Sequence, residues 1–136
     1  MAPRMLFVNL AVQDLPRAQA FFTALGFSFN PQFTNDAAAC MVISDRAFVM
    51  LVTREMFGQF TTRPLAEPQQ VTEGLYALSC DDRDEVDRLA QIALENGGAA
   101  AMPPQDHGFM YSRSFYDLDG HHWEVFWMDP AHMQSE

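Results

Sequence analysis

Apolar and polar residues alternate along residues 5–12, MLFVNLAV, as in a strand with one buried face. The segment that follows has apolar residues at helical spacing, namely Leu15, Ala18, Phe21 and Leu25. Asp14 stands in front of this segment as an N-cap, and Gly26 follows it as a C-terminal stop. The pattern therefore predicts a strand followed by a helix.

Three extended runs come next, residues 27–33, 38–44 and 47–53, marked off by Asn-Pro, Asn-Asp and Asp-Arg breaks. The first half thus has the order β-α-β-β-β. Residues 54–73 carry two prolines and no sustained period, which predicts a linker that contains a short helix.

The same order of elements returns after the linker. Residues 75–80 form a strand pattern, and Asp81 or Asp82 caps a helix that ends at Asn96-Gly97-Gly98. Its apolar face consists of Val86, Leu89, Ala90 and Ala93. Extended runs at 99–101, 113–117 and 123–127 complete a second β-α-β-β-β module.

The two modules can be aligned at two points. Matching the helix caps Asp14 and Asp82 places Phe7 on Leu75. Matching the late turns at Asp45 and Asp119 places Met50 on Glu124. The offset between matched residue numbers is larger at these turns than at the helix caps. The difference between the two offsets predicts one insertion, in the loop around residues 105–109.

We expect an α+β fold in one domain, residues 1–136, with modules at about 1–53 and 74–130 joined by the linker 54–73.

Several short motifs follow one another in this two-module frame. They are Val12-Gln13-Asp14-Leu15-Pro16-Arg17-Ala18, Phe21-Phe22, Leu25-Gly26-Phe27, and Asp117-Leu118-Asp119-Gly120 through Glu124. In this order and spacing, residues 5–128 resemble the vicinal oxygen chelate superfamily. That superfamily contains glyoxalase I, extradiol dioxygenases, fosfomycin-resistance enzymes and bleomycin-resistance proteins. The resemblance implies a homodimer and two modules that form an open, cup-shaped mixed β-sheet barrel with flanking helices.

The resemblance also implies four metal-ligand positions, which fall at Phe7, Met50, Leu75 and Glu124. Only Glu124 can bind a hard cation, whereas zinc, nickel or iron needs two or three N, O or S donors. We therefore expect that the protein has no metal and no cofactor. A site rebuilt around Glu124 and His122 is the alternative.

Alternation along the last strand assigns side chains to faces. His122, Glu124 and Phe126 share one face, and His121, Trp123, Val125 and Trp127 share the other. The expected ligand contacts are Phe7, Asn9, Met50, Leu75 and Phe126, together with Tyr111 and Arg113 from segment 103–115. Glu124 and His122 are candidate catalytic residues. Alternatively, Glu124 pairs with Arg113, or Arg113 ties its loop to Asp106, Asp117 or Asp119.

Charge narrows the range of partners. The formal charge of -10 repels phosphate backbones and anionic lipids, so we expect no nucleic-acid or membrane partner. The same negative charge favours a cationic ligand. No signal peptide or membrane-spanning run is apparent, which predicts a cytoplasmic protein. Cys40 and Cys80 lack metal-site or redox spacing and are expected to be buried thiols.

Three functions are compatible with these patterns. The first is a glyoxalase/bleomycin-resistance-like protein that binds a small cationic or aromatic molecule in the β-cup without a metal. The alternative is a glyoxalase-type lyase, isomerase or dioxygenase that uses Glu124, with a rebuilt metal site or by metal-free acid/base chemistry. In the third, methionine and phenylalanine side chains fill the cavity and leave a dimeric interaction module.

Overall fold

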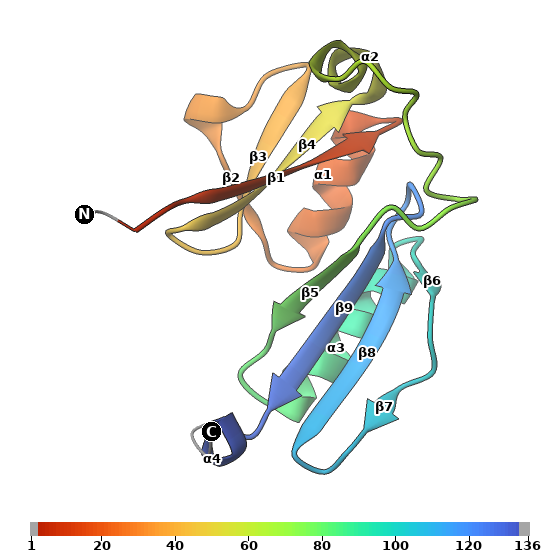
Figure 1. Ribbon diagram of the computed structural model, residues 1–136. Helices are drawn as coiled ribbons and strands as arrows, with labels where there is room; N and C mark the ends of the chain where they lie inside the picture. Colours follow the sequence, from red (N-terminus) through yellow and green to blue (C-terminus); the bar gives the residue numbers. More distant parts are fainter. Residues whose placement is uncertain (1–2, 134–136) are drawn as a thin grey trace. The chain divides into compact units, whose positions relative to one another are not determined.

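The structure is a computed structural model that describes residues 3–133 (Figure 1). The chain divides into two compact units, Met1–Leu65 (unit 1) and Ala66–Glu136 (unit 2). The division falls inside the predicted linker, so residues 54–65 belong to unit 1 and residues 66–73 to unit 2.

Unit 1 is a four-stranded sheet with one covering helix, and its strand order is β1-β4-β3-β2. Its elements are β1 (Leu6–Val12), α1 (Leu15–Ala24), β2 (Ser28–Asn30), β3 (Ala38–Val42) and β4 (Ala47–Thr53). The Asp14 side chain accepts a hydrogen bond from the Arg17 N–H at 3.1 Å, which confirms the predicted N-cap. Phe21 and Phe22 are buried between α1 and the sheet and supply much of the core of this unit.

Unit 2 repeats this plan with strand order β5-β9-β8-β6 and an added strand, β7, on β8. Its elements are β5 (Leu75–Ser79), α3 (Arg83–Glu95), β6 (Ala99–Ala100), β7 (Gln105–Asp106), β8 (Met110–Tyr116) and β9 (His122–Met128). The cap of α3 is Asp82, which accepts from the Glu85 N–H at 2.8 Å, while Glu85 accepts from the Asp81 N–H at 2.7 Å. The Asp82 side chain is therefore the cap, and Glu85 binds the residue before it in a variant of the capping box.

Short helices connect and end these elements: η1 (Pro31–Phe33), α2 (Arg54–Phe57), η2 (Gly58–Phe60) and α4 (Pro130–Met133). Helix α2 is the short helix expected in the linker. In residues 3–133 no helix is long and apolar enough to cross a membrane.

Strand register confirms the alignment of the two modules. The parallel pair β1 and β4 places Asn9 opposite Met50, and the parallel pair β5 and β9 places Ala77 opposite Glu124. In the alignment predicted from the sequence, Asn9 corresponds to Ala77 and Met50 corresponds to Glu124. The structure therefore pairs equivalent positions in the two units. The predicted insertion contains β7, which has no counterpart in unit 1. Sequence reasoning missed β7 because Gln105-Asp106 shows no alternation of apolar and polar residues.

Each sheet has one face covered by its helix and one open face (Figure 1). In unit 2, Trp123 and Val125 point to the α3 side and are each 1% exposed. On the other side Leu75 is 68% exposed, and His122, Glu124 and Phe126 are half-buried. The α+β class is confirmed, and within the part of the chain that the structure describes neither sheet closes into a barrel.

Candidate ligand-binding site

A pocket of about 290 Å³ lies on the open face of the unit 2 sheet. We call it the Glu124 pocket. Strands β8 and β9, the start of β5 and the segment 102–107 form its walls. Its lining includes Leu75, Gln105, His107, Ser112, His122 and Glu124. The pocket thus brings together four sequence-predicted site residues, Leu75, Arg113, His122 and Glu124, with polar groups that the sequence analysis did not select.

Antiparallel pairing of β8 with β9 sets the chemistry of the pocket. Ser112 stands opposite Phe126, and Ser114 stands opposite Glu124, so both serines share the open face with the carboxylate. Ser112 is only 3% exposed, and it borders the pocket. Ser112 and Ser114 alternate in the sequence with Tyr111, Arg113 and Phe115. Combined with the pairing to β9, this alternation could have placed the two serines on the open face.

The Glu124 carboxylate is half-buried and, among residues 3–133, makes neither a salt bridge nor a hydrogen bond. The predicted pair with Arg113 does not form. Arg113 instead donates to Asp87 of α3 at 3.3 Å. The reason is strand alternation, because Ser112 and Ser114 occupy the open face and Arg113 points to the helix side.

Tyr111 is bound on the same helix side. Its hydroxyl donates to Asp87 at 2.5 Å, and this hydrogen bond to a carboxylate raises the pKa of Tyr111. Arg113 borders the Glu124 pocket, but its guanidinium is held by the same Asp87. Two of the alternative partners of Arg113 are already occupied. Asp106 is bound by Arg83, and the Asp117 carboxylate accepts four N–H groups.

Segment 102–108 forms the outer wall of the pocket and is fixed at both ends. The Met102 N–H donates to the Ser114 hydroxyl at 2.8 Å. Near the other end, Arg83 donates to both carboxylate oxygens of Asp106 at 2.8 and 3.1 Å. This guanidinium holds the pKa of Asp106 down, at about 2. His107 and Gln105 are therefore presented to the pocket by a wall tied back to α3.

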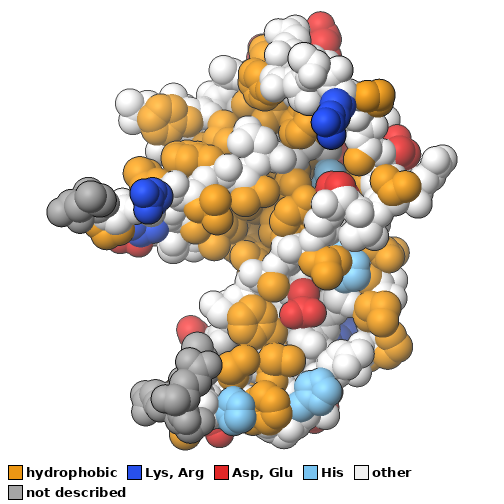
Figure 2. Space-filling model, viewed as in Figure 1, with side chains coloured by type: hydrophobic (Ala, Val, Ile, Leu, Met, Phe, Trp, Pro, Cys, Tyr) orange, Lys and Arg blue, Asp and Glu red, His pale blue; other side chains and the backbone are white. Residues whose placement is uncertain are grey.

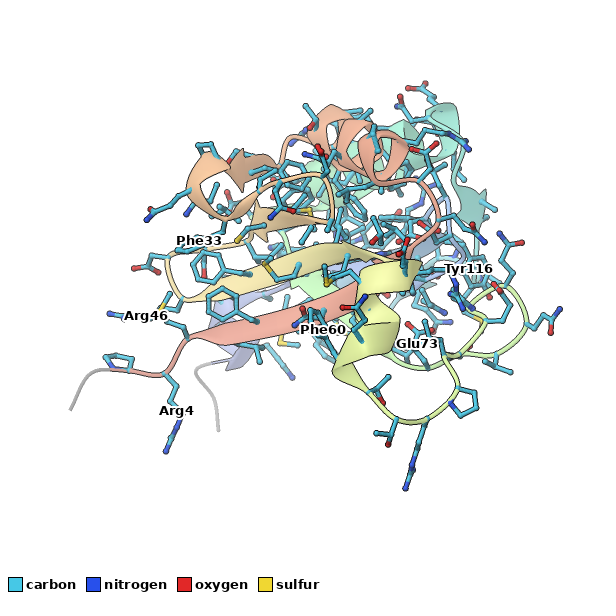
Figure 3. All side chains as sticks on the ribbon, turned by 90° about the horizontal axis from the view of Figure 1, so that it is seen from above. Arg4, Phe33, Arg46, Phe60, Glu73 and Tyr116 are labelled. Carbon is cyan, nitrogen blue, oxygen red and sulfur yellow. The ribbon has the colours of Figure 1, made fainter. Side chains whose placement is uncertain are left out.

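The two adjacent histidines separate onto opposite faces, as predicted. His122 lines the Glu124 pocket, and its ring meets Tyr116 edge-on with centroids 5.4 Å apart. His121 is 4% exposed, and its Nδ1 lies 3.0 Å from the Glu73 carboxylate. Glu73 comes from the segment before β5, and Tyr116 from the end of β8 (both labelled in Figure 3).

The first aspartate of the Asp-Leu-Asp-Gly turn is structural. Asp117 accepts the N–H groups of Asp119, Gly120 and His121 on one oxygen and the Trp123 indole N–H on the other, at 2.9 to 3.1 Å. Burial raises its pKa, while these donors oppose that effect. The turn therefore sets the start of β9 and the placement of His122 and Glu124.

The residues at the four inferred metal positions do not fit a divalent cation. Phe7 and Met50 lie on the unit 1 sheet, where the Phe7 ring stacks on Phe48 with centroids 4.8 Å apart and Asn9 stands opposite Met50. Leu75 and Glu124 lie in unit 2. Across the described residues, no three His, Cys, Asp or Glu side chains come together as a metal site.

The cysteines do not add a soft ligand to either unit. Cys40 is buried and Cys80 half-buried, and neither forms a disulfide. Burial raises the pKa of Cys40 and raises that of Cys80 to about 11, so both are thiols at neutral pH. The prediction of burial was wrong for Cys80, which directly follows β5 and is only half-buried.

Comparison with known proteins identifies the family. The model of the bleomycin resistance protein-like N-terminal domain matches residues 4–44. A hypothetical protein from S. aureus shares 31% identity over 93% of this chain and 94% of its own, with a TM-score of 0.76. A search of curated proteins gives no match.

Two further structures share the fold at lower identity. A glyoxalase/bleomycin resistance protein/dioxygenase family enzyme from Burkholderia phytofirmans has 15% identity and a TM-score of 0.76, over 93% of this chain and 99% of its own. A fosfomycin resistance protein from Mesorhizobium loti has 21% identity and a TM-score of 0.65, over 99% and 98%. The chain belongs to the glyoxalase/bleomycin resistance/dioxygenase family, within the vicinal oxygen chelate superfamily, which confirms the resemblance seen in the sequence.

Proposed function

We propose that this protein binds a small organic cation, with an aromatic or other apolar body, in the Glu124 pocket and without a metal. The observation that carries the proposal is the half-buried carboxylate of Glu124, which has no partner among residues 3–133 and lies in a pocket of about 290 Å³. A buried charge without a partner is costly, and a ligand that brings the opposite charge removes that cost.

The surroundings of Glu124 suit such a ligand. An ammonium or amidinium group donates to the carboxylate in a charge-assisted hydrogen bond, and the Ser112 hydroxyl offers a further acceptor. Apolar, histidine and acidic side chains lie together on the open face of this sheet (Figure 2). The formal charge of -10 attracts a cation toward the protein over longer distances.

The expected ligand contacts divide between the two units. Leu75 borders the Glu124 pocket, and Phe126 stands on the same open face opposite Ser112. Phe7, Asn9 and Met50 belong to unit 1, so their contact with the ligand stays a prediction, as do the contacts of Tyr111 and Arg113. The homodimer and the cytoplasmic location also stay predictions.

Titration with benzamidine, which is an aromatic cation at neutral pH, tests the proposal. We expect saturable binding by calorimetry, and the variant Glu124→Gln should bind about tenfold more weakly or worse, which corresponds to a loss of about 1.4 kcal/mol. Glu95→Gln removes an exposed glutamate at the end of α3 and serves as the matched control. Equal affinity of the Glu124→Gln variant and the unchanged protein would refute the role of the carboxylate.

A second candidate function is favoured by one observation, that Glu124 and His122 line the same pocket. In a metal-free lyase or isomerase, the Glu124 carboxylate would take a proton from the carbon next to a carbonyl, and His122 would donate to the carbonyl oxygen. Hydroxyacetone in heavy water tests this chemistry by NMR. Deuterium uptake that Glu124→Gln abolishes would support an enzyme, whereas uptake at the uncatalysed rate leaves a binding protein.

A further inference from the structure

A second cavity, of about 410 Å³, lies in unit 2 beneath residues 67–73. We call this segment the arch. One end of the arch rests on the Asp-Gly turn, because a Cβ atom on Gly120 would stand 3.0 Å from Gln69 N and from the Pro68 carbonyl carbon. At the other end, Glu73 accepts the Tyr76 hydroxyl at 2.7 Å and lies 3.0 Å from His121 Nδ1.

The arch is also held by hydrogen bonds of its own. The backbone N–H groups of Gln70 and Val71 both donate to the Glu67 carbonyl, at 2.9 and 3.0 Å, so the arch holds its own turn. Val71 lines the cavity and is itself 53% exposed. A cavity that exists before binding needs little ordering of the chain when a ligand enters.

The lining of the arch cavity is polar but offers no free charge. Its polar side chains are the amides of Gln69 and Gln70, the hydroxyl of Thr72 and the phenol of Tyr116. Asp117 also borders the cavity, but its carboxylate already accepts four N–H groups. Ala99 and Leu118 add an apolar floor. The Glu124 pocket, by contrast, contains a carboxylate that no described residue pairs with.

We propose that the arch cavity is a second ligand site, which takes an uncharged aromatic carboxamide or a molecule of the same hydrogen-bonding type. A primary amide both donates and accepts, which matches the side-chain amides of Gln69 and Gln70. An aromatic ring fits against Leu118 and the Tyr116 ring, with Ala99 leaving the space for it. The site requires no charge on its ligand because the cavity presents none.

The proposal does not depend on the function proposed for the Glu124 pocket. Tyr116 lines the arch cavity, and its ring contacts His122, which lines the Glu124 pocket. The two cavities are therefore neighbours with different lining chemistry, and a pair of probes that differ only in charge separates them. Benzamide is neutral, and benzamidinium has nearly the same shape with a positive charge.

The test is a titration of the full-length, isotope-labelled protein with benzamide, followed by NMR. We expect saturable, weak binding that shifts the backbone signals of Gly97, Val71 and Gly120, while the signals of Glu124 stay in place. Ala99→Trp fills the cavity and should weaken benzamide binding at least tenfold. Ala100→Trp is the matched control, because Ala100 is exposed, adjacent on β6 and outside the lining, and it should retain the affinity within twofold.

A second variant keeps the test valid if Ala99→Trp fails to fold. Gln70→Ala changes an exposed residue of the arch and should weaken benzamide binding several-fold while leaving benzamidinium binding unchanged. Absence of saturable benzamide binding, shifts that map to the Glu124 pocket, or equal affinity in Gln70→Ala would each overturn the proposal. Loss of benzamidinium binding alone would count only against the function proposed for the Glu124 pocket.

Discussion

Asp117 and Glu124 belong to one turn-and-strand segment, but their carboxylates have different surroundings. Asp117 is buried and satisfied by four N–H donors, so it stabilises the turn and has no capacity left for a ligand. Glu124 is half-buried and has no partner among residues 3–133. At the scale of single residues, hydrogen-bond satisfaction distinguishes the structural carboxylate from the candidate ligand anchor.

Glu73 gives a prediction about pH at this scale. Burial raises the pKa of Glu73, but hydrogen bonds from Tyr76 and His121 outweigh burial and leave the pKa below its usual value of 4.5. A lowered carboxyl pKa contributes stability above the pKa of the unfolded chain, and this contribution is lost as the pH falls through the folded-state pKa. Glu73→Gln should therefore lower the free energy of unfolding by about 1 kcal/mol at pH 7.

Urea unfolding at pH 7 and at pH values below 4.5 checks this expectation. The difference between Glu73→Gln and the unchanged protein should shrink as the pH falls, because protonation of Glu73 removes the same interaction. Glu95→Gln is the control and should show no such convergence. If the difference in unfolding free energy between the two proteins were the same at all pH values, the charge of the Glu73 carboxylate would contribute nothing to stability.

At the scale of elements, β7 depends on side chains from another element. Its two residues pair with Ser112 and Tyr111, which is a short ladder, and Arg83 at the start of α3 holds Asp106 through two hydrogen bonds. The Arg83 guanidinium also lies over the rings of Tyr111 and Trp127, at 4.9 and 5.4 Å from their centroids. The wall of the Glu124 pocket is thus positioned from the far side of the sheet.

Arg83→Gln should loosen this wall with little loss of global stability. We expect faster amide hydrogen exchange at Gly108, whose N–H donates to Asp106, and at His107, whose N–H donates to the Met110 carbonyl. The low pKa of Asp106, about 2, keeps the pair charged across the range in which exchange is measured. Arg88→Gln, which breaks an exposed pair with Glu85 on the same helix, is the control and should leave both amides unchanged.

At the scale of the whole molecule, the two units carry the same architecture with different side chains on their open faces. The unit 1 sheet presents stacked aromatic rings at Phe7 and Phe48, whereas the unit 2 sheet presents His122, Glu124 and serine hydroxyls. Of the four positions at which relatives are expected to place metal ligands, Phe7, Met50 and Leu75 offer no hard donor.

Metal content of protein purified without chelator is therefore expected to be far below one ion per chain, and zinc, nickel, manganese or ferrous iron should bind only weakly by calorimetry. Glu124→Ala should leave these weak affinities unchanged. Stoichiometric metal, or tight binding that Glu124→Ala abolishes, would instead establish a rebuilt site that includes Glu124. Sedimentation equilibrium on the same sample tests the predicted homodimer.

The amino-acid sequence by itself determined the order of the main elements, the cap at Asp14, the choice of Asp81 or Asp82 for the second cap, the faces of the last strand and the equivalence of Met50 with Glu124. These features follow from local chemistry, because apolar periodicity, capping side chains and alternation act over a few residues. This reasoning did not predict strand β7, because a two-residue strand is defined only by the strand that it pairs with.

Tertiary structure alone decided which side chains meet. Arg113 binds Asp87 of α3, which leaves Glu124 without a partner in the described part of the chain, and His121 approaches Glu73 from 48 residues away. The Glu124 pocket acquires Ser112 and Ser114 through the register of β8 on β9, and its wall acquires an anchor at Arg83. Such contacts join residues that are distant in the chain, so their partners depend on strand order and register and not on any local pattern.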